Sequence, residues 1–532
     1  MASTSAGRRE WIALGVLCLP LLMVSMDVSV LFFAVPHISE SLQPSATQVL
    51  WIFDVYGFVL AGLLLTMGSV ADRIGRRRLL LVGALAFAAA SVLAAYAGSA
   101  EQLIAARALL GVGGATLMPS TLAIVRTLFV DPVERAKAIG VWSAVMAGGV
   151  GVGPVVSGIL LAHFWWGSVF LINVPVMVAL LAVAPFLLPE SRSAAAKVDL
   201  ISSALSLAAI FPVVHAIKQG ATSGLSWPVV LYALGGGCFG LLFVRRQRQL
   251  EAPMVDLRLF ARHGFSGSVT VQMIAMFGVM GNAVLMTQYL QSVLGYTALT
   301  AALWSLLPSV FVGAAAPTAV ALAARLGRPI VMASGFVVAA AGFIGLQSAG
   351  AHSSILPALV SASFVAVGLV SVATLVTEYA VGVAPPERTG AVSALFETAG
   401  ELGGALGMAV LGSVLSAVYA ARVVLLLPPG LTPGQSAAAT QTLGDAGVIA
   451  AQVTARSGGG GVGQQVLDAA RSAYVAGMHT TGLVAASVLL VGAVVAVTTL
   501  PRAAAGALGP EQPQPASSRE TDQLGPARAD RP

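Results

Sequence analysis

The sequence consists largely of long apolar runs that are separated by short polar segments. A helix that spans a bilayer needs about 20 consecutive apolar residues, and we count fourteen runs of roughly that length. Only 9% of the residues are charged, whereas soluble domains carry about 25%, so the side chains cannot cover a globular surface in water. Because helices satisfy their backbone hydrogen bonds internally in lipid, the sequence predicts an all-α integral membrane protein.

The fourteen predicted spans cover approximately residues 11–35, 49–70, 79–99, 102–126, 137–161, 167–188, 199–219, 227–244, 265–290, 299–322, 329–349, 355–380, 389–418 and 475–500. The distribution of positive charge supports this number and orientation of spans. With the N-terminus in the cytoplasm, 23 of the 28 Lys and Arg residues fall in cytoplasmic segments, as the positive-inside rule requires. We therefore expect a multi-pass protein of a bacterial plasma membrane with both termini in the cytoplasm.

A faint internal repeat suggests how the spans are grouped. The segment ADRIGRRRLLLVG recurs 252 positions later as AARLGRPIVMASG, which predicts two parallel halves with a substrate site between them. The predicted organisation is a cytoplasmic N-terminus (1–10), an N-terminal six-helix bundle (11–188), two inserted helices (199–244) and a C-terminal six-helix bundle (265–500). The latter includes a long extracellular loop (419–474), and a disordered cytoplasmic tail (503–532) follows it.

Four acidic residues lie inside apolar runs, where a charge costs about 2.5–3.5 kcal/mol on insertion scales. Asp27 lies 16 residues into its span, or about 24 Å along a helix, and Asp54 falls in the same half of the membrane. Glu397 and Glu401 are four residues apart and share one helical face. A carboxylate that titrates near physiological pH can exchange a proton for an organic cation, which predicts proton-coupled transport.

Each of these residues also has a structural interpretation. Asp54 also fits a hydrated position at the membrane interface, and Asp27 fits a structural pair with a neighbour. Glu397 and Glu401 also fit the cytoplasmic end of a span that begins later. Arg107 is the lone cation in the interior of its span, which ends at the cytoplasmic Arg126, and a buried guanidinium must find carboxylate or carbonyl partners.

Several motifs resemble the major facilitator superfamily. The segment GSVADRIGRRR is similar to its cytoplasmic loop signature. MDVSVLFFAVP, WIFDVYGFVLAG, RALLGVGG, FLINVP and LFETAGELGGALGMAVLGS resemble the fourteen-span drug:proton antiporter family of the QacA/LfrA type. The matching loop residues are Gly68, Asp72, Arg73, Gly75, Arg76 and Arg77, and those that resemble the antiporter motif are Gly140, Gly149, Gly153, Pro154 and Gly158. Ser157 stands in place of a usual glycine, and the resemblance covers about residues 11–500.

The resemblance implies the major facilitator fold, with two six-helix bundles plus two inserted helices. It implies a proton- or substrate-binding role for Glu397, and for Arg107 a role in proton transfer or in holding the first span, with a purely structural ion pair as the alternative. The loop residues would form a latch that pairs across the halves, and for the arginines simple positive-inside anchoring is the alternative. The glycine motif is associated with exporters, although ordinary small-residue packing also explains it.

Methionines and aromatic residues offer a candidate lining for an apolar cavity. The candidates are Met26, Met273, Met276, Met280 and Met286, with Phe33 and Tyr289. Methionine adapts to irregular surfaces, but such residues in spans more often serve packing.

The sequence therefore predicts a proton-coupled antiporter, and not an enzyme, that exports lipophilic cationic drugs, antiseptics and dyes by alternating access. We expect a monomer that uses the proton gradient and requires no cofactor, metal, ATP or nucleic acid. A dedicated exporter of a natural product made by its host is the close alternative. A channel or receptor is remote, because no charge ring, filter loop or soluble domain is apparent. No Walker A motif is present, which argues against an ATP-driven pump.

Overall fold

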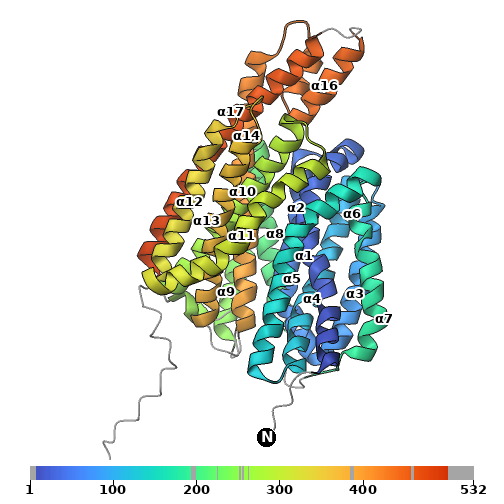
Figure 1. Ribbon diagram of the computed structural model, residues 1–532, viewed down its shortest axis with the longest axis vertical. Helices are drawn as coiled ribbons and strands as arrows, with labels where there is room; N and C mark the ends of the chain where they lie inside the picture. Colours follow the sequence, from blue (N-terminus) through green and yellow to red (C-terminus); the bar gives the residue numbers. More distant parts are fainter. Residues whose placement is uncertain are drawn as a thin grey trace, which may run out of the picture.

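The computed structural model describes residues 7–192, 199–224, 226–250, 253, 257–261, 263–383, 389–456 and 461–500, and the regular structure in these ranges is entirely helical (Figure 1). The N-terminal half comprises α1 (Arg8–Leu42), α2 (Ala46–Ile74), α3 (Arg76–Ala95), α4 (Ala100–Leu128), α5 (Pro132–His163), α6 (Ser168–Leu171) and α7 (Asn173–Leu187). Two further helices follow, α8 (Leu200–Ser223) and α9 (Trp227–Gln249).

The C-terminal half contains α10 (His263–Gln288), α11 (Ala298–Leu326), α12 (Arg328–Gly345), α13 (Leu356–Val383), α14 (Thr389–Leu426), α15 (Pro433–Ala439), α16 (Leu443–Arg456) and α17 (Val462–Thr499). Short 3₁₀ helices cover Leu257–Ala261 and Leu346–Ser348, and a π-helical turn covers Tyr289–Val293.

The expected all-α membrane architecture is confirmed. Within the described ranges, eleven helices are long and apolar enough to cross a bilayer. Shorter apolar stretches lie at Val55–Leu64, Gly148–His163 and Ile201–Ile217, in α2, α5 and α8. The α2, α5 and α8 helices are 29, 32 and 24 residues long, but the apolar stretches described within them are shorter than a span, so the count of fourteen spans stays a prediction.

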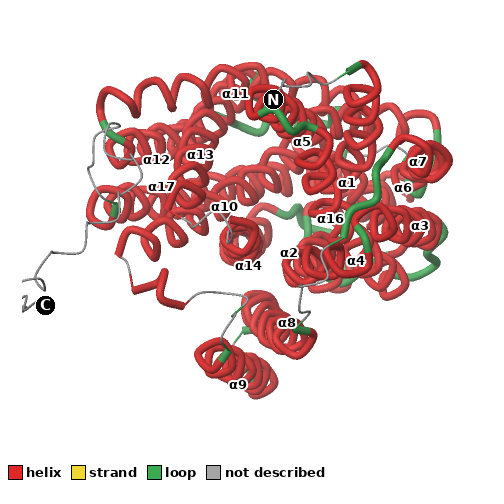
Figure 2. The backbone as a smooth tube through the Cα atoms, turned by 90° about the horizontal axis from the view of Figure 1, so that it is seen from below, coloured by secondary structure: helices red, strands yellow, loops and turns green. Residues whose placement is uncertain are grey.

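Each half has its own hydrophobic core, and the inserted pair stands beside both. One core is built from α1–α7 and the other mainly from α10–α17. Figure 2 shows α8 and α9 as a separate pair at the edge of the molecule, where α8 packs on α2 and α14. Trp51 of α2 donates a hydrogen bond from Nε1 to Nδ1 of His215 over 3.2 Å, and the two rings stack. The α8 helix therefore covers the seam between the halves.

The internal repeat corresponds to one local structure that occurs twice. Gly75 joins α2 to α3 with φ +120°, and Gly327 joins α11 to α12 with φ +88°. Both positions favour glycine because side chains rarely adopt positive φ. The same offset of 252 relates Gly83, which packs against Thr116 of α4, to Gly335, which packs against Gly368 of α13. The two halves thus share helix junctions and helix contacts.

The α14 and α17 helices are longer than the apolar runs from which they were predicted. Both have 38 residues, because α14 continues through the apolar segment YAARVVLL (419–426) and α17 begins already in the more polar segment VGQQVLDAARSAY (462–474). They lead to α15 and α16 at the end of the bundle opposite the N-terminus (Figure 1), called here the α16 end. The Tyr419 hydroxyl donates to the carbonyls of Ala439 (2.9 Å) and Thr442 (3.1 Å), which attaches these short helices to α14.

Close contact between α12 and α13 predicts that Gly368 is required for stability. A β-carbon on Gly368 would lie 2.7 Å from the backbone nitrogen of Ala339, so Gly368→Val should destabilise the protein by about 1–3 kcal/mol through overpacking. Gly313→Val is the matched control, because no neighbouring atom lies within 4 Å of a β-carbon there. Thermal unfolding in detergent should show a lower midpoint for Gly368→Val alone, and equal midpoints would contradict the packing described.

Candidate functional site

A buried ion pair between Asp27 of α1 and Arg107 of α4 lies in the N-terminal half. Nη1 of Arg107 donates to Oδ2 of Asp27, and the two side chains are 1% and 2% exposed. Nε of Arg107 donates to the carbonyl of Ile52 over 3.0 Å, and Nη2 to that of Phe53 over 3.3 Å. The guanidinium also lies 4.9 Å from the ring centroid of Tyr56, within the range of a cation–π contact. Each of the three side-chain nitrogens of Arg107 therefore has a hydrogen-bond partner, and the residue joins three helices.

Glycines of α4 explain how Arg107 reaches α2. A β-carbon on Gly111 would lie 2.6 Å from the carbonyl oxygen of Tyr56, and one on Gly114 would lie 3.1 Å from the Tyr56 hydroxyl. That hydroxyl donates to the carbonyl of Val24 in α1 over 3.3 Å. Small residues permit such backbone approach inside a membrane, so the segment RALLGVGG positions both the guanidinium and the aromatic ring beneath it.

The glycine-rich face of α5 packs against α1 on either side of Asp27. A β-carbon on Gly149 would lie 3.0 Å from the carbonyl oxygen of Leu22, and one on Gly153 would lie 3.1 Å from that of Met26. Ser157 donates to the carbonyl of Val30 over 3.0 Å. The α5 helix therefore fixes the segment of α1 that carries the aspartate.

The remaining residues of this motif have different surroundings. Gly158 faces α11 of the opposite half, where a β-carbon would lie 2.6 Å from Cα of Leu299. Pro154 is inside α5, and a β-carbon on Gly140 would meet no neighbouring atom within 4 Å. The contact at Gly158 brings the halves together at the α16 end of the molecule.

The loop between α2 and α3 is anchored within the N-terminal half. Arg76 donates to the carbonyl of Ala123 (3.3 Å) and to Oγ1 of Thr127 (3.2 Å). Arg77 donates to the carbonyls of Pro185 (3.1 Å) and Leu188 (3.0 Å). Arg73 is exposed and Gly68 is in ordinary contact with Pro119, 3.9 Å from a β-carbon placed there. These contacts attach the loop to α4 and α7.

Glu190, just after α7, completes this junction. Its Oε1 accepts hydrogen bonds from the backbone nitrogens of Arg77 and Ser191, each over 3.2 Å. A β-carbon on Gly75 would lie 2.6 Å from the same oxygen. An acidic side chain at the first turn of a helix satisfies its unpaired backbone N–H groups, and Glu190 does so for α3.

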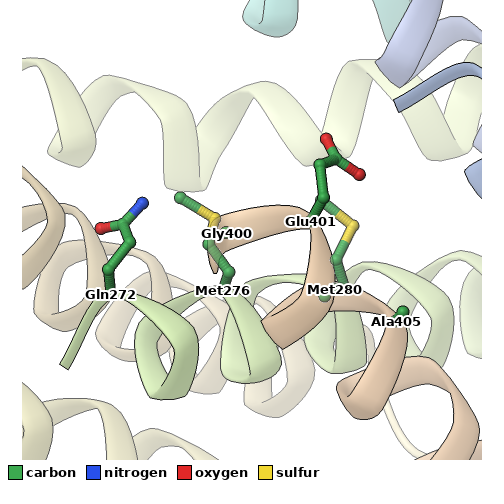
Figure 3. Close-up of a pocket in the computed structure, with 7 residues that line it drawn as sticks. Gln272, Met276, Met280, Gly400, Glu401 and Ala405 are labelled. Atoms are coloured by element: carbon green, nitrogen blue, oxygen red, sulfur yellow. The ribbon is translucent and has the colours of Figure 1, made fainter. Parts of the chain in front are cut away.

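A pocket between α10 and α14 contains Glu401. It is partly open to solvent, and Glu401 lines it together with Gln272, Met276, Met280, Gly400, Gly404 and Ala405. Figure 3 shows the glutamate extending away from α14, with both methionine side chains beside it. Its carboxyl group reaches the backbone of α2 at Gly57, so an acidic side chain of the C-terminal half lies against the N-terminal half. The pocket combines one acid with soft apolar groups.

The other predicted site residues can be placed only in part. The side chains of Asp54, Asp72 and Glu397 lie outside the described residues, although their backbones belong to α2 and α14. Of the predicted methionine lining, Met276 and Met280 face the pocket, whereas Met26 and Met286 are 3% and 8% exposed within the cores.

Some of the residues that build the site were not predicted from the sequence. Tyr56 supports Arg107, Gly57 contacts Glu401, and Gln272 lines the pocket with 7% exposure. A weak sequence signal existed for the first two, because both follow Asp54 within three positions in the span. Glu190 lies two residues beyond the sixth predicted span (167–188), where an acid is expected to be an ordinary solvated charge.

Comparison with known proteins identifies extensive similarity. Residues 17–247 match the Major Facilitator Superfamily. The chain is 42% identical over 498 residues to the multidrug efflux pump LfrA of Mycolicibacterium smegmatis, covering 93% of this chain and 97% of that protein. It is 35% identical over 484 residues to the methyl viologen resistance protein SmvA of Salmonella typhimurium, covering 91% and 96%. A solved bacterial homolog to the human lysosomal transporter Spinster, inward-facing and unoccupied, gives a TM-score of 0.60 at 15% identity, covering 93% and 99%.

The ion pair predicts an asymmetric response to single substitutions. Asp27→Leu should destabilise the protein more than Arg107→Met, because arginine cannot lose its proton whereas an abandoned carboxyl can become neutral. Breaking a buried pair from one side costs about 3–5 kcal/mol, and replacing both charges costs much less. The double variant should therefore unfold at a higher temperature than Asp27→Leu alone. Additive losses in this double-mutant cycle would show that the two groups do not interact.

Proposed function

The chain belongs to the Major Facilitator Superfamily, and from this premise we propose that it is a proton-coupled antiporter that exports lipophilic cations by alternating access. It is a multi-pass membrane protein of bacterial type whose homologues include multidrug efflux pumps, and proteins of this superfamily are transporters and not enzymes. Cationic drugs, antiseptics and dyes are the proposed substrates. The proton gradient is the proposed source of energy, without a further cofactor.

The observation that carries this proposal is the position of Glu401. Its carboxylate lines a pocket with Met276 and Met280 and also lies against α2 of the opposite half. A carboxylate attracts a cation, and polarisable thioethers adapt to apolar bodies of varied shape. A group between the halves can respond to access from either side of the membrane. These properties suit a site that receives a lipophilic cation and releases it elsewhere.

Competition for one carboxylate is the simplest coupling mechanism. When Glu401 is ionised it can hold a cation, and when it binds a proton its charge is neutral and the attraction is lost. A proton entering from the outer side would therefore displace the cation. The transporter would then change conformation so that the neutral site becomes accessible from the inner side. Release of the proton there would restore the negative charge. Each cycle would exchange protons for a cation.

We assign Asp27 and Arg107 a different part in the same cycle. The carboxylate of Asp27 already accepts a hydrogen bond from Arg107, and the guanidinium has two further carbonyl partners. Such a pair keeps α1, α2 and α4 together and would have to separate before Asp27 could take a proton. Asp54 and Glu397 are proposed as further coupling acids, because they lie one turn from Gly57 in α2 and from Glu401 in α14.

The glycine contacts and the arginine loop support rocking between the halves. The contact of Gly158 with Leu299 joins the halves at the α16 end, and the helix that carries it also contains Pro154. Gly68, Asp72, Gly75 and the loop arginines are proposed to latch the opposite end in the alternate state. The positive-inside rule assigns this arginine-rich end to the cytoplasm. Both termini would then be cytoplasmic in a protein that acts as a monomer in the plasma membrane.

The proposal predicts that Glu401→Gln abolishes pH-driven efflux. In proteoliposomes that contain a cationic dye, an imposed proton gradient should drive dye movement by the wild-type protein and not by this variant, because an amide cannot carry the proton. Glu378→Gln is the matched control. Glu378 lies in α13, at the end of the molecule opposite the α16 end. Its side chain is 44% exposed and forms an ion pair with Arg328 over 2.7 Å.

The same assay can also contradict the proposed mechanism. Dye movement by Glu401→Gln at the wild-type rate would remove Glu401 from the coupling mechanism. Transport by the wild-type protein that ignores the proton gradient would exclude proton coupling altogether. Both variants should reach the membrane in equal amounts, which quantitative immunoblotting of the vesicles verifies.

A further inference from the structure

Gly57 of α2 lies directly opposite the carboxylate of Glu401. A β-carbon on Gly57 would lie 2.5 Å from Cδ of Glu401 and 2.7 Å from its Oε1, and closer still to Oε2. These three atoms are the nearest neighbours of that position, and all belong to the end of one flexible side chain. The missing side chain at residue 57 therefore leaves the space in which the carboxylate lies.

We infer that Gly57 is a positioning residue that sets where Glu401 holds its charge, and this inference rests on the proposed function. Any side chain at residue 57 would exclude the carboxylate from the backbone of α2 and move it toward the methionine-lined pocket. Glycine at residue 57 thus allows the glutamate of one half to pack against the backbone of the other half. This contact between Glu401 and α2 has to break whenever the halves move relative to each other.

The surroundings of residue 57 determine that the Glu401 side chain, and not the α2 helix, would move to make room for an added side chain. Phe58 of α2, Val214 of α8 and Ala405 of α14 form a buried apolar cluster beside it, with exposures of 1%, 0% and 1%. On the other side, Tyr56 is fixed by its hydrogen bond to Val24 and by Arg107. The backbone of α2 is thus held on both sides of residue 57, whereas the glutamate has rotatable bonds.

This arrangement allows the effect of Gly57→Ala on transport to be distinguished from an effect on folding stability. Alanine is the better helix former than glycine, so Gly57→Ala does not weaken α2 itself. The three atoms nearest to the added methyl group all belong to the carboxylate end of Glu401, and the fold can absorb the methyl group by a rotation of that side chain. A loss of transport without a loss of stability is therefore expected. A merely structural glycine, by contrast, would lose both together.

The test combines Gly57→Ala with a shortened acid. Gly57→Ala should slow proton-driven dye efflux by about tenfold or more, since misplacement by an ångström is costly in organised sites. Glu401→Asp withdraws the carboxylate by about 1.5 Å, one carbon–carbon bond. It should slow efflux in the wild-type background and raise it in the Gly57→Ala background. Gly412→Ala is the matched control in α14, because a β-carbon there would have no neighbouring atom within 4 Å, and it should leave the rate unchanged.

A second measurement does not depend on transport. Labelling of Glu401 by dicyclohexylcarbodiimide, followed by mass spectrometry of the full-length protein, reports the surroundings of the carboxyl group. Gly57→Ala should label faster than the wild type, because its carboxyl group is displaced into the pocket, and Gly412→Ala should label at the wild-type rate.

The outcomes separate the inference from the proposed function. Wild-type efflux in Gly57→Ala, or failure of Glu401→Asp to raise the rate of that variant, would overturn the role of Gly57. Unchanged labelling of Glu401 in Gly57→Ala would overturn it as well. If the wild-type protein moves no dye in response to a proton gradient, the proposed function fails. The labelling comparison then still decides whether residue 57 positions the carboxylate.

Discussion

The cost of placing charge in a bilayer is the constraint on which this structure depends. Arg107 cannot give up its proton, so it must be surrounded by acceptors wherever α4 crosses the membrane. The carboxylate of Asp27 and the carbonyls of Ile52 and Phe53 supply them. This requirement determines that α1, α2 and α4 lie together, and the glycines of α4 and α5 provide the close approach. Electrostatics and small-residue packing therefore act on the same three helices.

Glu401 satisfies the same constraint differently. Its side chain crosses to the backbone of α2 beside a pocket lined by methionines. Two acids inside helices of one chain thus occupy different environments, because Asp27 is buried and paired with a permanent cation, whereas Glu401 is half-buried and lines a pocket. Such a division suits a transporter, in which one charge maintains the scaffold and another is exchanged. The α8 helix covers the seam between α2 and α14.

Much of the fold could be predicted from the sequence because it depends on local rules. Apolar run lengths indicate the spans, and the repeat predicts paired halves, which Gly75 and Gly327 reproduce with positive φ. Asp27 and Arg107 were each identified as buried charges, but their pairing depends on how three helices pack. Gly57 was not identified, because its neighbour lies 344 positions away in the other half. The first thirteen residues of α17 were not predicted as part of the span, because this polar segment is helical by propensity without being apolar.

The central claim is that a cation and a proton compete for one carboxylate. Calorimetric titration of the detergent-solubilised protein with tetraphenylphosphonium, repeated in buffers of different ionisation enthalpy, counts the protons released on binding. The account predicts proton release by the wild-type protein and none by Glu401→Gln. Cation binding without proton release in the wild type, or undiminished release in Glu401→Gln, would contradict it.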